Sequence, residues 1–361
     1  MSLGTELSRF CYSNGFGWLP FMMPFTLPLI FMYDLVYFHS YFLIPVTIFL
    51  ILPILDLLVG VDYYNPTKEE TSSDIYKFLL YMWTFTEVAL FIATSWYVTV
   101  IELTLVEFIL IAYSFGIISG AIGNTVAHEL HHKYMNKKMR TCGRLLLLVS
   151  NYVHFSVEHE RGHHKNVATE IDPATSLRNQ TIYKFIITSI ITGLIHAWIL
   201  EVQRLSKKFK PIFSVENVMI QGIVLPLCLI IILKIQLGNS AVFFFLAQSL
   251  FAILMTESAN YIQHYGLLRK KVMKDGNMCL EPVGLNHSWN SYGFMVNHMI
   301  FNLPRHSDHH TKSQKNYQEL IYIPERPTHP IGYPFMIVMA MFPWVWFKVM
   351  NKRVDMVVKS A

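Results

Sequence analysis

Histidines are concentrated in four short stretches of the 361-residue sequence, which read HELHH, EHERGHH, NYIQHYG and LPRHSDHH. The candidate metal ligands in these stretches are His128, His132, His159, His163, His164, His264, His306, His309 and His310. A single zinc ion takes about four protein ligands. Nine imidazoles therefore predict two metal ions that keep open positions for chemistry.

The spacing inside the stretches predicts which histidines share a helix face. His128 and His132 are four residues apart, so a helix places them one turn apart on one face, while His131 points elsewhere. His159 and His163 repeat this spacing. In the last stretch, the first histidine can pair with either of the two that end it. We therefore expect paired imidazoles from several helices to converge.

Imidazole ligands suit zinc, copper, iron and nickel. The four cysteines lie far apart and form no CxxC pair, which disfavours a thiolate cage and a rubredoxin-type iron site within these residues. Two ions are most useful where both change valence, as in redox chemistry. We therefore favour two iron ions.

The elements that position these histidines are expected to be membrane helices. Hydrophobic residues make up 53% of the chain and charged residues 15%, and the mean hydropathy is +0.36. Soluble domains carry about 25% charged residues. With about 20 apolar residues needed per span, the candidate spans are 19–38, 41–60, 77–98, 102–125, 216–236 and 241–262.

Four further features of the apolar pattern carry predictions. The first span lacks a signal-peptide cleavage site, so we expect it to be retained. Residues 182–203 form either another span or a helix lying on the membrane surface. Residues 333–350 are interrupted by Pro343, which favours a re-entrant or interfacial element. Spans one and two are expected to form a hairpin with almost no linker at His39 and Ser40.

Basic runs give the orientation, because Lys and Arg collect in cytoplasmic loops. Runs follow span four and span six and precede span five, which predicts cytoplasmic termini and all four histidine stretches at the cytoplasmic face. The same distribution argues against nucleic acid as a partner. The predicted fold is an all-α integral membrane protein of about six transmembrane helices, with a cytoplasmic histidine-rich cap that holds a di-metal site. Its parts are a four-span segment at 19–125, a histidine segment at 126–215, spans five and six at 216–262 and a C-terminal cap at 263–361.

The stretches, taken in order, resemble those of the integral-membrane alkane 1-monooxygenases, the di-iron alkane ω-hydroxylase family that includes xylene monooxygenase. The family patterns HELxHK, EHxxGHH, NYxEHYGL and LQRHSDHH match residues 128–133, 158–164, 260–267 and 303–310. DLLVGVDYYNP, VATEIDPATS and HSWNS are similar as well, so the likeness covers nearly the whole chain. Gln263 and Pro304 depart from the family pattern, but no histidine is missing.

The resemblance implies one hydroxylase domain over residues 1–361. It implies O₂-dependent hydroxylation of the terminal methyl group of medium- or long-chain alkanes at a histidine-ligated di-iron centre. Electrons would come from a separate rubredoxin or equivalent with its reductase, and the apolar substrate would enter from the lipid bilayer. The membrane would be a bacterial inner membrane or an ER-type membrane. Expected supports of the ligand histidines are Glu129, Asp308, Asn260 and Asn290.

Other functions and roles stay open at this point. Alternatives are a hydroxylase of aromatic methyl groups or acyl chains, a membrane acyl desaturase and, less favoured, a histidine-site metal transporter. Glu87, inside a span, has either a functional role or a packing role. Structural roles are expected for His287 and His298. The remaining histidines are expected to be ordinary interfacial or surface residues: His39, His154, His196 and His329.

Overall fold

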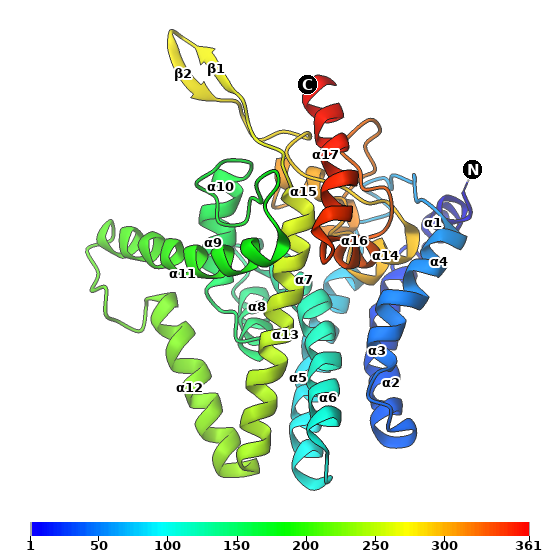
Figure 1. The fold of residues 1–361 in the computed structure, drawn as a ribbon, viewed down its shortest axis with the longest axis vertical. Helices are drawn as coiled ribbons and strands as arrows, with labels where there is room; N and C mark the ends of the chain where they lie inside the picture. The colour runs from blue at the N-terminus through cyan, green and yellow to red at the C-terminus, as the bar shows by residue number, and fades with distance from the viewer. Residues whose placement is uncertain (1, 361) are drawn as a thin grey trace.

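The computed structural model describes residues 2–360 and consists of a bundle of long helices with a cap at one end (Figure 1). Both termini lie at the cap end, as an even number of crossings requires. The bundle consists of η1 (Leu19–Phe25), α2 (Thr26–Tyr33), η2 (Asp34–Phe38), α3 (Leu43–Val46), η3 (Thr47–Ile51), α4 (Leu52–Val59), α5 (Ile75–Val100), α6 (Leu105–Ile118), η4 (Ser119–Gly123), α7 (Asn124–His131), α12 (Val218–Leu237) and α13 (Asn239–His264).

The other elements join the bundle to the cap or build the cap itself. They are α1 (Leu3–Ser13), α8 (Lys137–Val149), α9 (Phe155–Glu158), η5 (His159–His163), α10 (His164–Asn166), α11 (Ile182–Ser206), β1 (Lys271–Lys274), β2 (Asn277–Leu280), α14 (Phe294–Met299), α15 (His306–Thr311), η6 (Tyr317–Glu319), α16 (Tyr333–Ala340) and α17 (Pro343–Ser360). The predicted all-helical fold is confirmed apart from β1 and β2. This antiparallel hairpin turns at Asp275 and Gly276, both with positive φ. Asp-Gly is a strong hairpin signal, so the sequence did contain it.

Within residues 2–360, six helical segments are long and apolar enough to cross a membrane: Leu19–Phe38, Ile75–Val100, Leu105–His131, Ile182–Ser206, Val218–Leu237 and Asn239–His264. Their number agrees with the prediction, but the set differs in one member. The expected second span is the shorter apolar helix Leu43–Val59, of 17 residues. At 1.5 Å per residue it is about 26 Å long, slightly below the bilayer core of about 30 Å.

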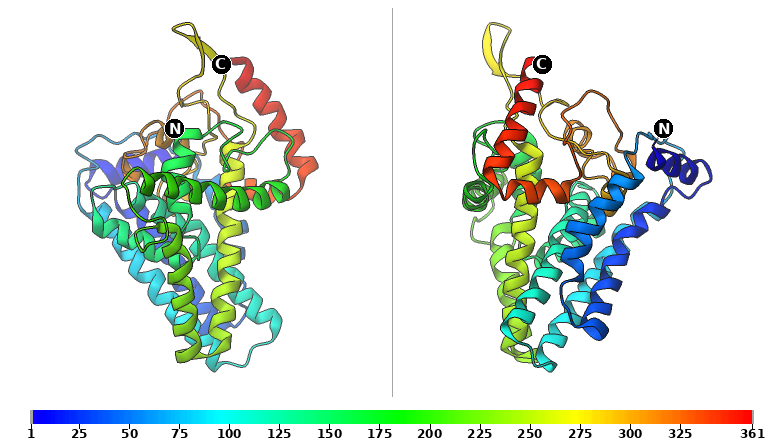
Figure 2. Two further views of the ribbon diagram at one scale, coloured as in Figure 1. Left: turned by 90° about the vertical axis from the view of Figure 1, so that its left-hand side faces the viewer. Right: turned by 45° about the vertical axis from the view of Figure 1, so that its right-hand side comes forward.

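The ambiguous segment 182–206 is α11, which meets the length and composition criteria. In Figures 1 and 2 it nevertheless runs crosswise to the long helices, at the junction of bundle and cap. Leu43–Val59 instead runs along the bundle in the same views. This arrangement favours the interfacial alternative for α11. Similarly, α16 lies crosswise and α17 rises away from the bundle in Figure 2, so Pro343 begins a new direction, as the interfacial interpretation expects.

The predicted hairpin at His39 and Ser40 is confirmed, and Asp34 organises it. The Asp34 carboxylate accepts hydrogen bonds from the backbone amides of Ser40 (3.0 Å), Tyr41 (3.0 Å) and Leu43 (2.9 Å). A turn between two apolar helices leaves backbone amides without helix partners. One side chain therefore satisfies three donors at the end of the bundle far from the cap.

Glu87 has the packing role that the sequence left open. Its carboxylate is fully buried and accepts hydrogen bonds from Trp83 Nε1 (2.7 Å) and Ser119 Oγ (2.8 Å). A Cβ atom at Gly123 would lie 2.2 Å from this carboxylate. Glycine is therefore required where η4 passes over α5, and Glu87 joins the two segments.

His329 was expected at the surface, but the structure buries it. It is 5% exposed, with its ring 5.6 Å from that of Trp289 and 5.7 Å from that of Tyr333. The surrounding loop folds beneath α17, which no local pattern indicates. His287 and His298 do have structural contacts: a loop amide at Gly284 donates to His287, and His298 contacts the carbonyl of Phe294.

Candidate metal centre

The ends of two bundle helices present the first set of histidines. His128 is in the last turn of α7 and His132 follows that helix directly, and their Nε2 atoms are 3.2 Å apart. His264 is the last residue of α13. His131 points away, with its Nδ1 3.2 Å from Glu160. The spacing of four residues thus has the expected result in the first stretch.

In the second stretch, the expected pairing of His159 with His163 is wrong. His159 instead pairs with His164, their Nε2 atoms being 3.0 Å apart. The cause is η5, a π-helix. In a π-helix the hydrogen bond closes at i+5, so residues five apart share a face. Such π turns occur often at functional sites.

The nine predicted histidines lie in two groups. The first contains five members: His128, His132, His159, His164 and His309. The second contains four members: His163, His264, His306 and His310. Within each group, the candidate ligand atoms lie within 4.8 Å of one another. The sequence left the partner of His306 open, and the structure pairs it with His310, at 3.0 Å between Nε2 atoms.

Adjacent histidines in the sequence belong to different groups. His163 and His164 point into separate groups, as do His309 and His310. The two groups are neighbours, because the ring centroids of His164 and His310 are 4.7 Å apart. Each of these two His-His dipeptides thus supplies one ligand to each group, which fixes the distance between the groups.

The nitrogen spacing fits metal coordination. Neighbouring Nε2 atoms in both groups are 3.0–3.3 Å apart, for example 3.1 Å between His164 and His132 and 3.0 Å between His306 and His264. With metal–nitrogen bonds of about 2.1 Å, ligands at right angles are about 3.0 Å apart and tetrahedral ligands about 3.4 Å apart. The inward-facing nitrogens are therefore already separated by the distances expected between ligands of one metal ion.

The electrostatics favour neutral, metal-ready imidazoles. Burial, together with the neighbouring histidines, holds the pKa values of His159, His309 and His310 well below the ordinary value. Burial also acts to lower the pKa of His163, but the Asp172 carboxylate, 2.9 Å from its Nδ1, raises that pKa on balance. Asp172 thus holds a proton on Nδ1 and leaves Nε2 for a metal.

Asp172 was missed as a support, although it is part of the family-like word IDPATS. Its carboxylate also accepts from the Thr175 hydroxyl at 2.6 Å. Of the four expected supports, Glu129 pairs with Lys133 (2.8 Å), Asp308 with Lys315 (2.6 Å) and Asn260 with Glu257 (3.1 Å). Asn290 accepts from the backbone amide of Ser307 at 2.9 Å and so fixes the start of α15. Within residues 2–360, none of these contacts joins one of the four residues to the imidazole ring of a ligand histidine.

Arg305 anchors the start of α15, which it directly precedes. It is 2% exposed, and its guanidinium donates to Asp62 Oδ2 (2.8 Å) and to the carbonyl of Leu320 (2.9 Å). Because Arg305 directly precedes His306, this buried pair determines where three ligand histidines lie. Asp62, in the family-like word DLLVGVDYYNP, was also missed from sequence.

We expect Asp172→Asn to weaken metal binding by the four-histidine group. Replacing a carboxylate that orients a ligand histidine typically costs about 10–100-fold in metal affinity. Competition with a chelator, followed by metal analysis, measures the change. Asp275→Asn, in the exposed turn of the β-hairpin, is the matched control and should match wild type. Equal metal retention in both variants would contradict the role of Asp172.

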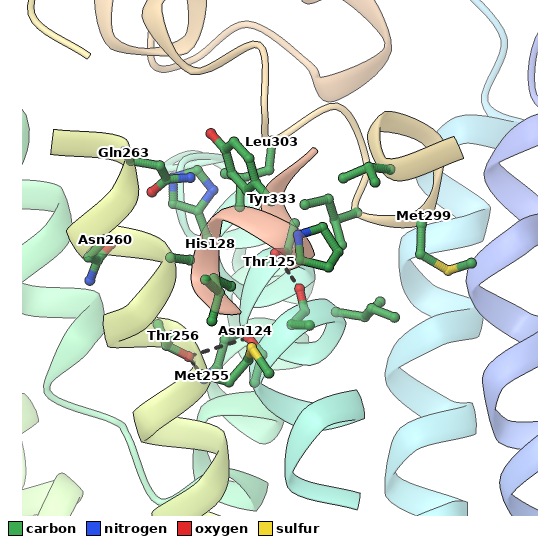
Figure 3. A pocket seen from close by; sticks show the side chains of 18 of the residues that line it. Asn124, Thr125, His128, Met255, Thr256, Asn260, Gln263, Met299, Leu303 and Tyr333 are labelled. Atoms are coloured by element: carbon green, nitrogen blue, oxygen red, sulfur yellow. Dashed lines mark hydrogen bonds between the residues drawn. The ribbon is translucent and has the colours of Figure 1, made fainter. Parts of the chain in front are cut away.

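An apolar cavity of about 80 Å³ ends at the histidines. His128 and His159 of the first group and His306 of the second line it. Figure 3 shows Gln263, Leu303 and Tyr333 on the cap side of His128, and Met255 and Thr256 on the bundle side. From there the cavity is lined by apolar residues of the bundle and of α14 and α16, such as Phe49, Leu52, Met299 and Ile337.

Three polar side chains in this lining, Asn124, Thr125 and Thr256, already have hydrogen-bond partners. Asn124 Nδ2 donates to the Thr256 hydroxyl at 2.7 Å, and Ser150 donates to Asn124 Oδ1 at 2.8 Å. Thr125 donates to the carbonyl of Ala121 at 2.7 Å. Gln263 Nε2 is an exception, because it is buried in this lining without a hydrogen-bond partner within residues 2–360. An apolar molecule can therefore fill most of the cavity without removing water from unpaired groups.

Comparisons with known proteins agree with this site. The fatty acid desaturase family model matches residues 103–323. Alkane 1-monooxygenase from Ectopseudomonas oleovorans is 39% identical over 308 residues, which is 84% of this chain and 75% of that protein. Alkane 1-monooxygenase 1 from Alcanivorax borkumensis is 38% identical over 309 residues, again 84% and 75%. The xylene/toluene monooxygenase hydroxylase component of Pseudomonas putida is 27% identical over 65% of this chain and 61% of its own length. With two histidine groups that fit a metal site at the end of a helical bundle, the chain belongs to the alkane 1-monooxygenase family and is a multi-pass membrane monooxygenase.

Proposed function

We propose that this enzyme hydroxylates the terminal methyl group of medium- or long-chain alkanes at two iron ions, one in each histidine group. The observation that carries the proposal is the apolar cavity that ends at members of both groups, His128, His159 and His306. Alkane 1-monooxygenase relatives at 34–39% identity support the reaction. Iron is proposed from the donor set, since nine imidazoles without thiolates suit a redox pair.

The residues of the chain have separate tasks in this reaction. The five- and four-histidine groups would hold the two irons, which when bound supply O₂ activation and two-electron chemistry. The apolar lining excludes water and aligns the chain end with the histidines. Because an alkane offers no hydrogen bond, selection rests on length and shape, at about 1–3 kcal/mol per methylene. Asp172 keeps the proton on His163 Nδ1, so that Nε2 stays a ligand.

Electrons would arrive from a rubredoxin-type donor on the cytoplasmic face. His164 is half-buried, whereas the other eight histidines are buried. Tyr134 and Met135, exposed by 40% and 97%, are separated from His132 by Lys133 alone, and the exposed Lys137 and Lys138 follow after Asn136. An acidic donor would be attracted to this basic surface.

Reversing the charge at Lys137→Glu/Lys138→Glu should lower kcat/KM for the donor about tenfold at low salt, with less effect at high salt. Turnover driven by a small-molecule reductant should stay unchanged. The matched control is Lys207→Glu/Lys208→Glu, an exposed basic pair in the loop after α11. Equal losses in both double variants would show that these lysines act only through general charge.

The test of the proposed function combines iron analysis with turnover. Purified enzyme, loaded with iron under anaerobic conditions, is supplied with octane or longer alkanes, O₂ and a rubredoxin with its reductase. We expect about two irons per chain and 1-alkanol as product. An enzyme that binds two irons and forms alkene, or that forms no 1-alkanol from any alkane, would refute the proposal.

A further inference from the structure

A second cavity lies beside the apolar cavity that ends at the histidines, which we call the substrate cavity. We call the second one the polar cavity, because its lining includes Glu158, Ser189 and Glu257. Its volume is about 20 Å³, enough for one water molecule or one hydroxyl group. Phe155, His159 and Asn260 line both cavities and so form the partition between them. The Phe155 ring stacks on His159 at 5.0 Å and on Tyr152 at 5.6 Å. A movement of this one ring would join the two spaces.

Two buried carboxylates give this polar cavity its chemistry. Glu257 is 1% exposed, and its Oε1 accepts from the Tyr152 hydroxyl (2.6 Å) and from Asn260 (3.1 Å). Glu158 is 7% exposed, and its Oε1 lies 2.7 Å from His196 Nδ1. Within residues 2–360, the Oε2 atoms of both carboxylates are buried without a donor in hydrogen-bond geometry. Such acceptors are costly to bury alone and call for a ligand with an O–H group.

The polar cavity adjoins an apolar groove on its other side. His154 lines both, and the groove of about 340 Å³ lies between α11 and α12. Leu194, Ile195 and Trp198 form the α11 side of the groove. Ile195 also belongs to an exposed apolar stripe with Ile187 and Ile191. Because α11 runs crosswise at the junction of bundle and cap (Figure 1), where an interfacial helix would meet the bilayer, we expect this exposed stripe and the groove to contact lipid.

We propose that the polar cavity binds the hydroxyl group of the primary alcohol product and that the groove under α11 is its exit to the bilayer. The inference rests on the proposed function. In the substrate cavity, Asn124, Thr125 and Thr256 are hydrogen-bonded already, and the unpaired atom of Gln263 is the donor Nε2, so a new O–H group meets no carboxylate acceptor there. Glu158 and Glu257 line the same polar cavity as His159 and offer hydrogen-bond acceptors there. An alkane, which has no donor, cannot use these acceptors. Product therefore moves toward the polar cavity, and substrate does not.

The first experiment blocks the exit. Ile195→Trp fills the groove, and Ile187→Trp, on the same stripe but outside the groove lining, is the matched control. Rapid-quench assays should show that Ile195→Trp forms its first alcohol at the wild-type rate and then turns over about tenfold more slowly, because product release has become limiting. Ile187→Trp should show no burst. Unchanged steady-state turnover in Ile195→Trp, or an equally slowed first turnover, would overturn the exit route. A normal first turnover keeps the proposed function intact in either case.

The second experiment tests the hydroxyl site by inhibition. Wild-type enzyme should bind 1-octanol about tenfold more tightly than the isosteric 1-methoxyheptane, which lacks a donor, as one buried hydrogen bond allows. Glu257→Gln should remove most of this preference while iron content stays unchanged. Equal inhibition by both compounds in wild type, or an undiminished preference in Glu257→Gln, would show that the cavity holds only water.

Discussion

Replacing His310 by alanine should release the iron ion that we propose for the four-histidine group and abolish alcohol formation, while the protein stays in the membrane. His310 Nε2 lies 3.3 Å from that of His163 and 3.0 Å from that of His306. Structural zinc sites with four ligands bind with about 10–16 kcal/mol, and by that scale each ligand contributes about 3 kcal/mol, or about 100-fold in affinity. Three histidines would then compete poorly with a chelator.

The neighbouring His309→Ala provides the comparison. His309 belongs to the five-membered group, so its loss leaves four ligands. After dialysis against a chelator, we expect about one iron per chain in His310→Ala and more than one in His309→Ala, both with activity below detection. His131→Gln, altered within the first histidine stretch but outside both groups, should keep both irons. Full iron retention in His310→Ala, or an equal loss in His131→Gln, would contradict the two-group assignment.

The comparison of sequence with structure shows which parts of such a site local spacing can determine. His128 and His132 pair as expected because α7 is regular up to its end. His159 and His163 do not, because the π turn of η5 shifts the register by one residue. A π turn inserts one residue into a helix and is maintained by tertiary contacts. Within the same helical segment, a Cβ atom at Gly162 would lie 2.4 Å from Oε1 of Glu158, four residues earlier, so glycine leaves room for this carboxylate in the π turn. Periodicity alone gives no sign of the π turn.

The supporting residues were harder to predict than the ligands. Ligands occur in clusters with helical spacing, whereas Asp172 and Asp62 are single acidic residues in loops. Their partners, His163 and Arg305, lie nine and 243 residues away in the sequence. Composition identified the bundle because apolar length is a local property. The crosswise course of α11 depends on what packs against it, so sequence left two alternatives open there.

Asp62→Asn should destabilise the protein by about 3–5 kcal/mol, because it leaves the buried Arg305 guanidinium without its counter-charge. The Asp62 carboxylate also accepts from the Ser8 hydroxyl (2.8 Å) and from the Tyr64 amide (3.0 Å), so one change weakens contacts to α1 and to α15. Thermal unfolding and iron content measure the effect. Asp74→Asn is the matched control, because Asp74 pairs with Lys77 at the same 2.8 Å but is 90% exposed. Exposed pairs contribute at most about 1 kcal/mol, so that variant should resemble wild type.

The pattern of iron loss would separate this effect from that of a ligand substitution. His306 and His310 of α15 belong to the four-membered group, and His309 belongs to the five-membered group. A displaced α15 therefore weakens both groups together, whereas His310→Ala weakens one. We expect Asp62→Asn to lose iron from both sites in parallel as temperature rises, with activity falling in step. Loss from the four-histidine group alone, or stability equal to that of Asp74→Asn, would show that Arg305 does not determine the position of α15.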